Sequence, residues 1–360
     1  MAAARGRRAE ERRPAGESKG IRASGRTCGS SRVNGRWLVS RPWSAGTTTP
    51  RQQGEGATRF LSLIVGTVGR ADTLRRLLDS LAGQSEPEFE VIVVDQNDAI
   101  DISPITDAYR GDLDIRRVEA PRGLSRARNI GLQHARGIVV GFPDDDCWYG
   151  PHVVARVRRA FSDDRTAVLT GRTVASDGLD SVSPHRLESG PVDRSNVFVS
   201  GNSNTLFCRR RVFETVGGFD EALGVGAATP YQSGEETDFL LRCLAHRIRV
   251  DYDRDLVVHH CHIRNASSAQ TRRARVYSQG YGRLLRVHGF GLTYLGAGVG
   301  RSLGRGILCF VTGDLDGARS RVHWAQGALV GYLSGRRSVP DHSSSEGQLT
   351  SGRSPAGQTR

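Results

Sequence analysis

The sequence predicts an α/β protein whose central sheet is flanked by helices and followed by a C-terminal helical extension. Two observations lead to this fold class. Between residues 60 and 142, short β-branched runs alternate with segments whose apolar residues recur at helical spacing. Beyond Ser267 the pattern is helical, with arginines on the helix faces. Because strands that alternate with helices form parallel sheets with crossover connections, we expect a parallel sheet in the first half of the chain.

The first half supplies the alternating elements. Residues 60–66 are a β-branched run closed by glycine, as in a buried strand. Residues 72–81 place four leucines at helical spacing behind Asp72, a residue type that caps helices. The expected order continues with strands at 89–95, 113–118 and 138–142 and a helix at 124–135. Ligands bind beyond the carboxyl ends of such strands, so the residues that follow them should meet at one rim.

The second half is less regular. Residues 176–200 are rich in Ser, Asp and Pro and are expected to form a loop. The later patterns predict strands at 204–208 and 249–258 and helices at 210–216, 235–245, 272–288, 292–311 and 315–333. We therefore expect a sheet domain over residues 59–264 and a helical extension over residues 265–335.

The two ends of the chain differ from its middle. Residues 1–58 have almost no apolar periodicity, so we expect them to be disordered, and we expect the same of residues 336–360. No apolar core follows the basic start, which argues against a secretory signal. The formal net charge of the chain is +13. Residues 1–59 contain thirteen basic and four acidic residues and so account for +9 of this charge. A nucleic-acid-binding protein is the non-enzymatic alternative, but because most of the charge lies outside the expected fold, no nucleic-acid partner is expected.

The cysteines and the apolar segments indicate the cellular compartment of the protein. None of the six cysteines forms a C-x-x-C pair, so a zinc ribbon or redox site is not expected, and we take the thiols as reduced in the cytoplasm. No stretch reaches 18 uninterrupted apolar residues. The helix expected at 292–311 carries Arg301 and Arg305, which favours an interfacial helix or a packed bundle over a membrane span. Peripheral contact with the inner face of the cell membrane is the corresponding expectation.

Three consecutive carboxylates, Asp144–Asp146, follow the strand expected at 138–142. Like charges repel, and carboxylates lose hydration when they crowd together, so folding alone gives no reason for the triplet. A divalent cation reverses this balance, because Mg²⁺ or Mn²⁺ is held by one or two carboxylates together with water and substrate phosphates. The triplet predicts a metal site for a phosphorylated substrate; the alternative is an acidic turn that caps the next helix.

Several segments together resemble the family 2 glycosyltransferases, which have the GT-A fold. The resemblance covers roughly residues 59–290, and its segments occur in the family's order: LSLIVGTVGRADTLRRLLDSL, FEVIVVDQND, RGLSRARNIG, FPDDD, GNSNTLFCRR, VGGFDE and GEETDF. The FPDDD segment stands at the place of the family's D-x-D motif. The resemblance implies a metal-dependent, inverting transfer of sugar from a nucleotide-sugar donor to a hydroxyl acceptor, and it makes residues 59–264 a GT-A domain.

The resemblance also implies roles for individual residues. The donor would be bound by Thr67, Arg70, Asp95, Arg126, Arg128 and Asp145. Asp144 and Asp146 would hold Mg²⁺ or Mn²⁺, with His260 nearby. The sequence departs from the family after Asp95, where Gln96 replaces the usual Asn, Gly or Ser, so the nucleotide base stays open. For Arg126 and Arg128 the alternative is a solvated helix face, and for Asp95 it is a helix cap.

The general base is expected in residues 235–238, because a carboxylate close to the anomeric carbon can take the acceptor's proton. The family usually has Glu-Asp here, with the aspartate as the base, and this chain has Glu236 at that position. We rank Glu236 first, Glu235 second and Asp238 third. The alternative is an acidic first helical turn that complements the helix dipole. A single base without a nucleophilic carboxylate fits direct displacement with inversion.

Three histidines and a cysteine occupy residues 259–262. Alternate residues of a strand share a face, so His260 and His262 are the pair to consider for a zinc site. The family often has a histidine near the metal or the diphosphate, which favours His260. The resemblance thus implies a glycosyltransferase of surface polysaccharide or glycoconjugate synthesis, with a glycan or a lipid-linked molecule as acceptor. The alternative enzyme is a nucleotidyltransferase, for which the segment after the first strand lacks a convincing glycine-rich phosphate loop.

Overall fold

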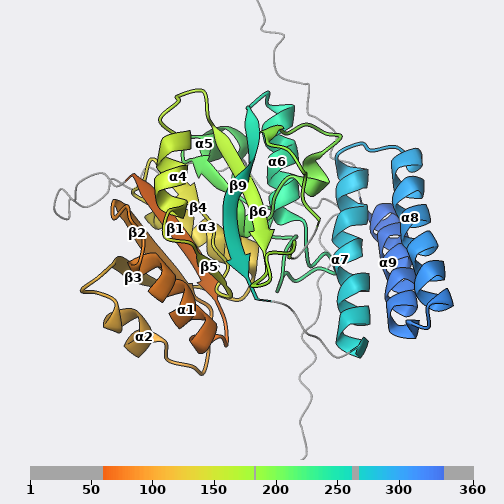
Figure 1. Ribbon diagram of the computed structural model, residues 1–360, viewed down its shortest axis with the longest axis horizontal. Helices are drawn as coiled ribbons and strands as arrows, with labels where there is room; N and C mark the ends of the chain where they lie inside the picture. Colours follow the sequence, from red (N-terminus) through yellow and green to blue (C-terminus); the bar gives the residue numbers. More distant parts are fainter. Residues whose placement is uncertain (1–59, 182–183, 262–266, 336–360) are drawn as a thin grey trace, which may run out of the picture. The chain divides into compact units, whose positions relative to one another are not determined.

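The computed structural model describes residues 60–181, 184–261 and 267–335 (Figure 1). The disorder expected for residues 1–58 and 336–360 and the role considered for His262 lie outside these ranges. The described chain is an α/β domain with a nine-stranded sheet, followed by three long helices. The fold class predicted from the sequence is confirmed.

The first half of the sheet is parallel, as expected. Strands β1 (Leu61–Thr67), β2 (Phe89–Asp95), β3 (Asp114–Glu119) and β4 (Val139–Gly141) pair in the order β3-β2-β1-β4. They are connected through α1 (Ala71–Ala82), α2 (Ser103–Ala108) and α3 (Leu124–His134). The chain therefore brings the carboxyl ends of β1, β2 and β4 to one rim.

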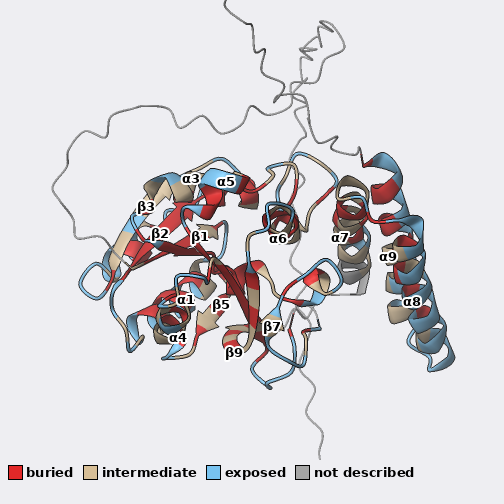
Figure 2. Ribbon diagram, turned by 90° about the horizontal axis from the view of Figure 1, so that it is seen from above, coloured by how far each residue is buried: buried red, intermediate tan, exposed pale blue. Residues whose placement is uncertain are grey.

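The two faces of this sheet carry different helices (Figure 2). Leu63 and Val65 of β1 pack with the leucines of α1 and with α4 (Val153–Ala160), whereas Ile64 between them packs with α3. This alternation is the period of two expected for a strand buried on both faces. Gly131 lets α3 approach closely, because a Cβ atom there would lie 2.3 Å from Cγ2 of Ile64.

The second half of the sheet is mixed. It contains β5 (Cys147–Tyr149), β6 (Val168–Val174), β7 (Gly190–Pro191), β8 (Phe207–Arg209) and β9 (Val250–His260). The sheet order continues from β4 through β8, β6 and β9 to β5, and β8 runs antiparallel to both β4 and β6. The sequence patterns did not predict α2, α4, β5, β6 or β7.

Two predicted elements differ from the structure. The strand expected at 204–208 is a 3₁₀ turn, Ser203–Thr205, followed by β8, because Asn202 and Thr205 form a capping box around the turn. The helix expected at 210–216 begins later, as α5 (Val212–Val216). Strand β6 has a register shift between Thr170 and Arg172, where Gly171 admits the carbonyl of Leu256. That glycine interrupts the β-branched pattern, which explains why β6 was not recognised.

The helical extension consists of α7 (Ser267–Val287), α8 (Leu292–Val311) and α9 (Leu315–Ser334). Helix α9 packs between α7 and α8 (Figure 1). Glycines allow the close α7–α9 contact, since a Cβ atom at Gly282 would lie 2.0 Å from the carbonyl oxygen of Ala328. None of the helices in the described ranges is long and apolar enough to cross a membrane.

Helix α7 is attached to the sheet domain at the start of α6 (Glu235–Ala245). His288, just after α7, lies 2.8 Å from Oδ1 of Asp238 through its Nε2 atom. Arg283 forms an ion pair with Asp220 at 3.3 Å. Leu284 packs over Gly234, where a Cβ atom would be 2.7 Å from Cδ1 of the leucine. The extension is therefore in contact with the segment that carries the candidate base.

Candidate functional site

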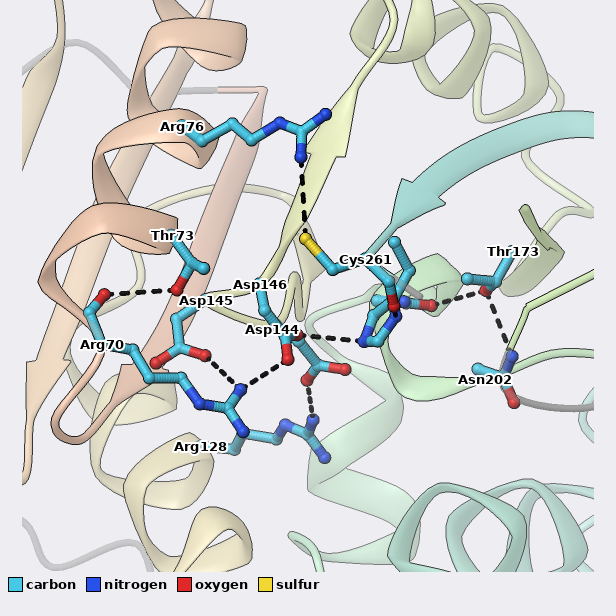
Figure 3. A network of polar contacts seen from close by, with 12 residues as sticks. Arg70, Thr73, Arg76, Arg128, Asp144, Asp145, Asp146, Thr173, Asn202 and Cys261 are labelled. Carbon is cyan, nitrogen blue, oxygen red and sulfur yellow. Dashed lines mark hydrogen bonds and ion pairs between the residues drawn. The ribbon is translucent and has the colours of Figure 1, made fainter. Parts of the chain in front are cut away.

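The Asp144–Asp146 triplet lies just beyond β4, beside the end of β1 (Figure 3). Thr67, the last residue of β1, donates its hydroxyl to Oδ2 of Asp145 at 2.8 Å. Arg70 reaches Asp145 at 3.0 Å and Asp146 at 2.6 Å through the same Nη1 atom. Burial raises the pKa of Asp145 to about 6, although Arg70 and Thr67 favour its charged form. Asp145 thus connects β1 to the triplet.

Arg128 connects the triplet to α6. Its side chain is 1% exposed, and its two Nη atoms each lie 2.9 Å from a carboxylate, one of Asp144 and one of Glu235. The sequence predicted Arg128 at the donor phosphates. In the structure its guanidinium group is shared between two carboxylates, so it stabilises the arrangement of the acidic cluster.

The three acidic candidates for the base differ in their partners. Glu235 is buried against Arg128. Asp238 is buried between Arg242 and His288, each at 2.8 Å. Glu236 is half-buried and forms no hydrogen bond or ion pair with another side chain in the described ranges. Burial and the charge of Glu235 raise the pKa of Glu236, which brings it closer to the range suited to a general base.

His260 joins the cluster from the end of β9. It pairs with Cys147 of β5, directly after the triplet, and its Nε2 atom lies 3.0 Å from Oδ1 of Asp146. Its Nδ1 atom lies 2.7 Å from the carbonyl oxygen of Cys261. Burial lowers the pKa of His260, but the hydrogen bond to Asp146 and the charges of Asp146 and Asp144 outweigh burial and raise it. His259 points elsewhere and stacks on Trp148.

The donor set is compatible with a divalent cation that is only partly held by protein. Four carboxylates, those of residues 144–146 and 235, pair with two arginines, Arg70 and Arg128, and the carboxylate of Glu236 lies near them without an ion pair in the described ranges. This surplus of negative charge is the setting in which a cation is favourable. In the described ranges no three His, Cys, Asp or Glu side chains gather as a metal site. Asp144 and Asp146 could supply two ligands, with His260 beside them, and Mg²⁺ commonly completes its shell with water and phosphate oxygens.

The remaining predicted donor-binding residues lie in two places. Asp95 ends β2 directly beside Thr67 of β1 in the sheet register. Its Oδ2 atom accepts from Arg117 at 2.9 Å, and its Oδ1 atom accepts from the backbone of Asn97. Arg126 is half-exposed and forms an ion pair with Glu221 at 3.0 Å. The structure therefore brings Asp95 to the rim with Thr67, whereas Arg126 is engaged by Glu221.

Two features beside the cluster were not found from the sequence. Tyr277 of α7 lies close enough to Glu235 and Asp144 for their charges to act on its hydroxyl group. On the other side, Arg76 covers the ring of Trp148 at 3.3 Å and contacts Cys261 (Figure 3). A tyrosine at helical spacing and an arginine on a helix face carry no distinctive motif, so only the fold reveals their position.

Comparison with known proteins agrees with these features. Residues 62–216 match the family described as glycosyl transferase family 2. The chain is 30% identical over 132 residues to putative glycosyltransferase EpsH of Bacillus subtilis, covering 33% of this chain and 38% of that protein. It is 27% identical over 179 residues to glycosyltransferase AglE of Haloferax volcanii, covering 46% and 57%. The chain spans less than two thirds of the length of either relative.

A solved structure shows the same fold. It is the mannosyltransferase PcManGT of Pyrobaculum calidifontis in complex with GDP-Man and Mn²⁺. The likeness covers 79% of this chain and 91% of that chain, with a TM-score of 0.52 and 16% sequence identity. At this identity the likeness concerns the GT-A fold alone. The family match, which contains four of the ordered motifs in full, identifies residues 62–216 as a glycosyltransferase family 2 segment.

Proposed function

We propose that this protein transfers a sugar from a nucleotide-sugar donor to a hydroxyl group of an acceptor, with inversion and with the help of Mg²⁺ or Mn²⁺. One observation carries the proposal: five carboxylates, three from the segment after β4 and two from the start of α6, lie near one another beside two arginines. Folding alone does not favour such a surplus of charge. PcManGT, which has the same fold, was solved with a nucleotide sugar and Mn²⁺, and this supports the same class of donor and cation here.

The metal would be held by Asp144 and Asp146, with His260 as the third candidate ligand. Such a cation neutralises charge that develops on the leaving diphosphate. The protein positions these groups through neighbouring contacts. Arg128 fixes Asp144 from α3, and His260 fixes Asp146 from β9. Thr67 and Arg70 hold Asp145 toward β1, where it would contact the sugar or the ribose.

The nucleoside would lie along the rim from Thr67 to Asp95. These two residues are paired in register at the ends of β1 and β2, so a ligand beyond the sheet would contact both. Asp95 is held in place by Arg117 and by the backbone of Asn97. Arg126 remains a candidate for the donor phosphates only if its ion pair with Glu221 opens.

Glu236 would accept the proton of the acceptor hydroxyl. The alternative carboxylates are engaged, Glu235 with Arg128 and Asp238 with Arg242 and His288. A base must be free to receive a proton, and its pKa should lie near the working pH. Glu236 meets both conditions, because it has no side-chain partner among the described residues and its pKa is raised by burial and by Glu235.

The acceptor would be a growing glycan or a lipid-linked molecule. The curated relatives include the succinoglycan biosynthesis protein ExoO of Rhizobium meliloti, which is 33% identical over 125 residues. Peripheral contact with the inner face of the cell membrane would suit a lipid-linked acceptor. The last turns of α8 support this contact, because they expose four large apolar residues: Ile307, Leu308, Phe310 and Val311, which are 67%, 63%, 65% and 74% exposed. Residues 267–335 contain nine arginines and two aspartates, a charge that favours anionic lipid.

A donor screen tests the proposal. Purified protein is titrated with a panel of UDP-, GDP- and dTDP-sugars, with and without Mn²⁺, and thermal stability is recorded. We expect at least one nucleotide sugar to raise the melting temperature, with a larger shift when Mn²⁺ is present. Asp146→Asn should remove the Mn²⁺-dependent part, whereas Arg126→Gln should keep it. If no donor in the panel binds, or if the shift is the same in Mn²⁺ and in chelator, the proposed metal-dependent donor site is refuted.

A further inference from the structure

The helical extension and residues 195–199 of the sheet domain line an open cavity of about 530 Å³ that none of the roles above uses. We propose that it is the acceptor-side subsite of the transfer reaction, and that it binds a saccharide bearing an anionic group, either a phosphate ester or a carboxylate. This inference rests on the proposed function. The volume lies within the range of roughly 300–1,000 Å³ that is usual for small-molecule sites.

Aromatic rings form one wall of the cavity. Tyr281 of α7 lies at its centre, with ring-centroid distances of 5.1 Å to Phe198 and 5.3 Å to Trp324, and Tyr294 completes the wall. Flat apolar rings that carry a polar atom suit the alternating C–H and hydroxyl faces of a sugar. Gly298 contributes space, because a Cβ atom there would lie 3.1 Å from the Tyr281 hydroxyl oxygen.

Positive charge also lines the cavity. Arg301, Arg305 and Arg321 line the cavity, and none of the lining residues is acidic. Within the described ranges, none of these arginines takes part in an ion pair. This distinguishes them from Arg128 and Arg70, whose guanidinium groups are engaged by carboxylates. An arginine fork that lacks an internal partner is suited to bidentate binding of a phosphate or carboxylate.

The cavity and the carboxylate cluster both have residues of α7 beside them. Tyr277, which is near Glu235 and Asp144, precedes Tyr281 by four residues on α7. Such residues share one helix face and are about 6 Å apart along the axis. Ser233, just before α6, donates to the carbonyl oxygen of Tyr277 at 2.8 Å and fixes this part of α7 against the candidate base. A saccharide in the cavity could therefore extend a hydroxyl group toward Glu236.

Ligand-observed NMR on the full chain tests the subsite with glucose 6-phosphate, glucuronate and glucose. We expect both anionic sugars to bind and glucose to bind about tenfold more weakly, because it lacks the charge-assisted hydrogen bonds. Arg305→Gln combined with Arg321→Gln should weaken the anionic sugars by about tenfold or more. Arg319→Gln is the matched control, since this exposed arginine of α9 does not line the cavity. Both variants should keep the wild-type circular dichroism spectrum.

Three results would overturn the proposal: no binding of either anionic sugar, equal binding of glucose, or unchanged affinity in the double variant. The relative strength of the two anionic probes shows whether phosphate or carboxylate is preferred. Donor binding is measured on the same samples and should be unchanged in the double variant. A wild type that binds anionic sugars but no nucleotide sugar would refute the proposed function and, with it, the acceptor role, while leaving an anionic-saccharide site.

Discussion

Replacing Arg128 by methionine should lower the free energy of unfolding by about 3–5 kcal/mol, the usual cost of leaving buried charges without their partner. Such a loss of stability is large for a single substitution, and the burial of Arg128 and its partners is the reason. Arg128 is 1% exposed and compensates two carboxylates at 2.9 Å each, Asp144 and Glu235, and Glu235 is itself 6% exposed. Methionine retains the aliphatic part of the side chain and removes the guanidinium group, so the lost ion pairs account for most of the change.

Arg126→Met is the matched control because it makes the same substitution on the same helix. Arg126 pairs with Glu221 at a similar distance of 3.0 Å, but the two side chains are 48% and 43% exposed. Exposed ion pairs contribute at most about 1 kcal/mol. Urea unfolding followed by circular dichroism measures both variants. Similar losses of stability would refute the reasoning that Arg128 compensates buried charge.

Three further predictions concern the base, the α6–α7 contact and the sheet. Glu236→Gln should lower kcat about 10²- to 10⁴-fold with donor affinity unchanged. Glu236→Asp retains a carboxylate and should keep measurable transfer. A fully active glutamine variant would show that the base lies elsewhere. Burial raises the pKa of Asp238, but His288 and Arg242 outweigh burial and lower it below 3.8. In urea unfolding, the wild type should therefore be more stable than Asp238→Asn, with the full difference above about pH 5 and a smaller one as the pH falls below 3.8. A difference in stability that does not change with pH would contradict this. Gly131→Ala should destabilise the protein by about 1–3 kcal/mol, because the added Cβ atom would meet Ile64. Gly300→Ala is its control in α8 and should stabilise the protein by about 0.5–1 kcal/mol, because there is open space around this glycine. Changes in melting temperature of the same sign for both variants would contradict the packing argument.

The elements with strong periodicity were predicted well from the sequence. Helices α6 and α8 have the bounds expected from their apolar spacing, and β2 matches its β-branched run. The elements that were missed have weak local signals. Strand β5 has only three residues, and β6 contains a glycine at its bulge. Their positions depend on pairing with β9, a contact between distant residues that periodicity does not encode.

The sequence predicted which residues make up the candidate site better than it predicted which of them contact one another. The motifs indicated the acidic triplet and the acidic start of α6, and the structure brings both to one cluster through Arg128. Arg126 and Arg128 looked equivalent as candidates for the phosphates. Residues two apart on a helix point in different directions, and only the packing of α3 decides that Arg128 faces the cluster and Arg126 faces Glu221.

The acidic residues at the start of α6 show how contacts separate roles that the sequence leaves equal. All three complement the helix dipole, so the dipole does not distinguish a base from a structural carboxylate. Asp238 binds Arg242 and His288 and so fastens α6 to the end of α7. Glu235 binds Arg128 and so fastens α6 to the triplet. Because both flanking carboxylates are fixed by cations, Glu236 between them is held in position without a cation of its own. A carboxylate in that situation keeps a raised pKa and a free lone pair, which are the properties that proton abstraction requires.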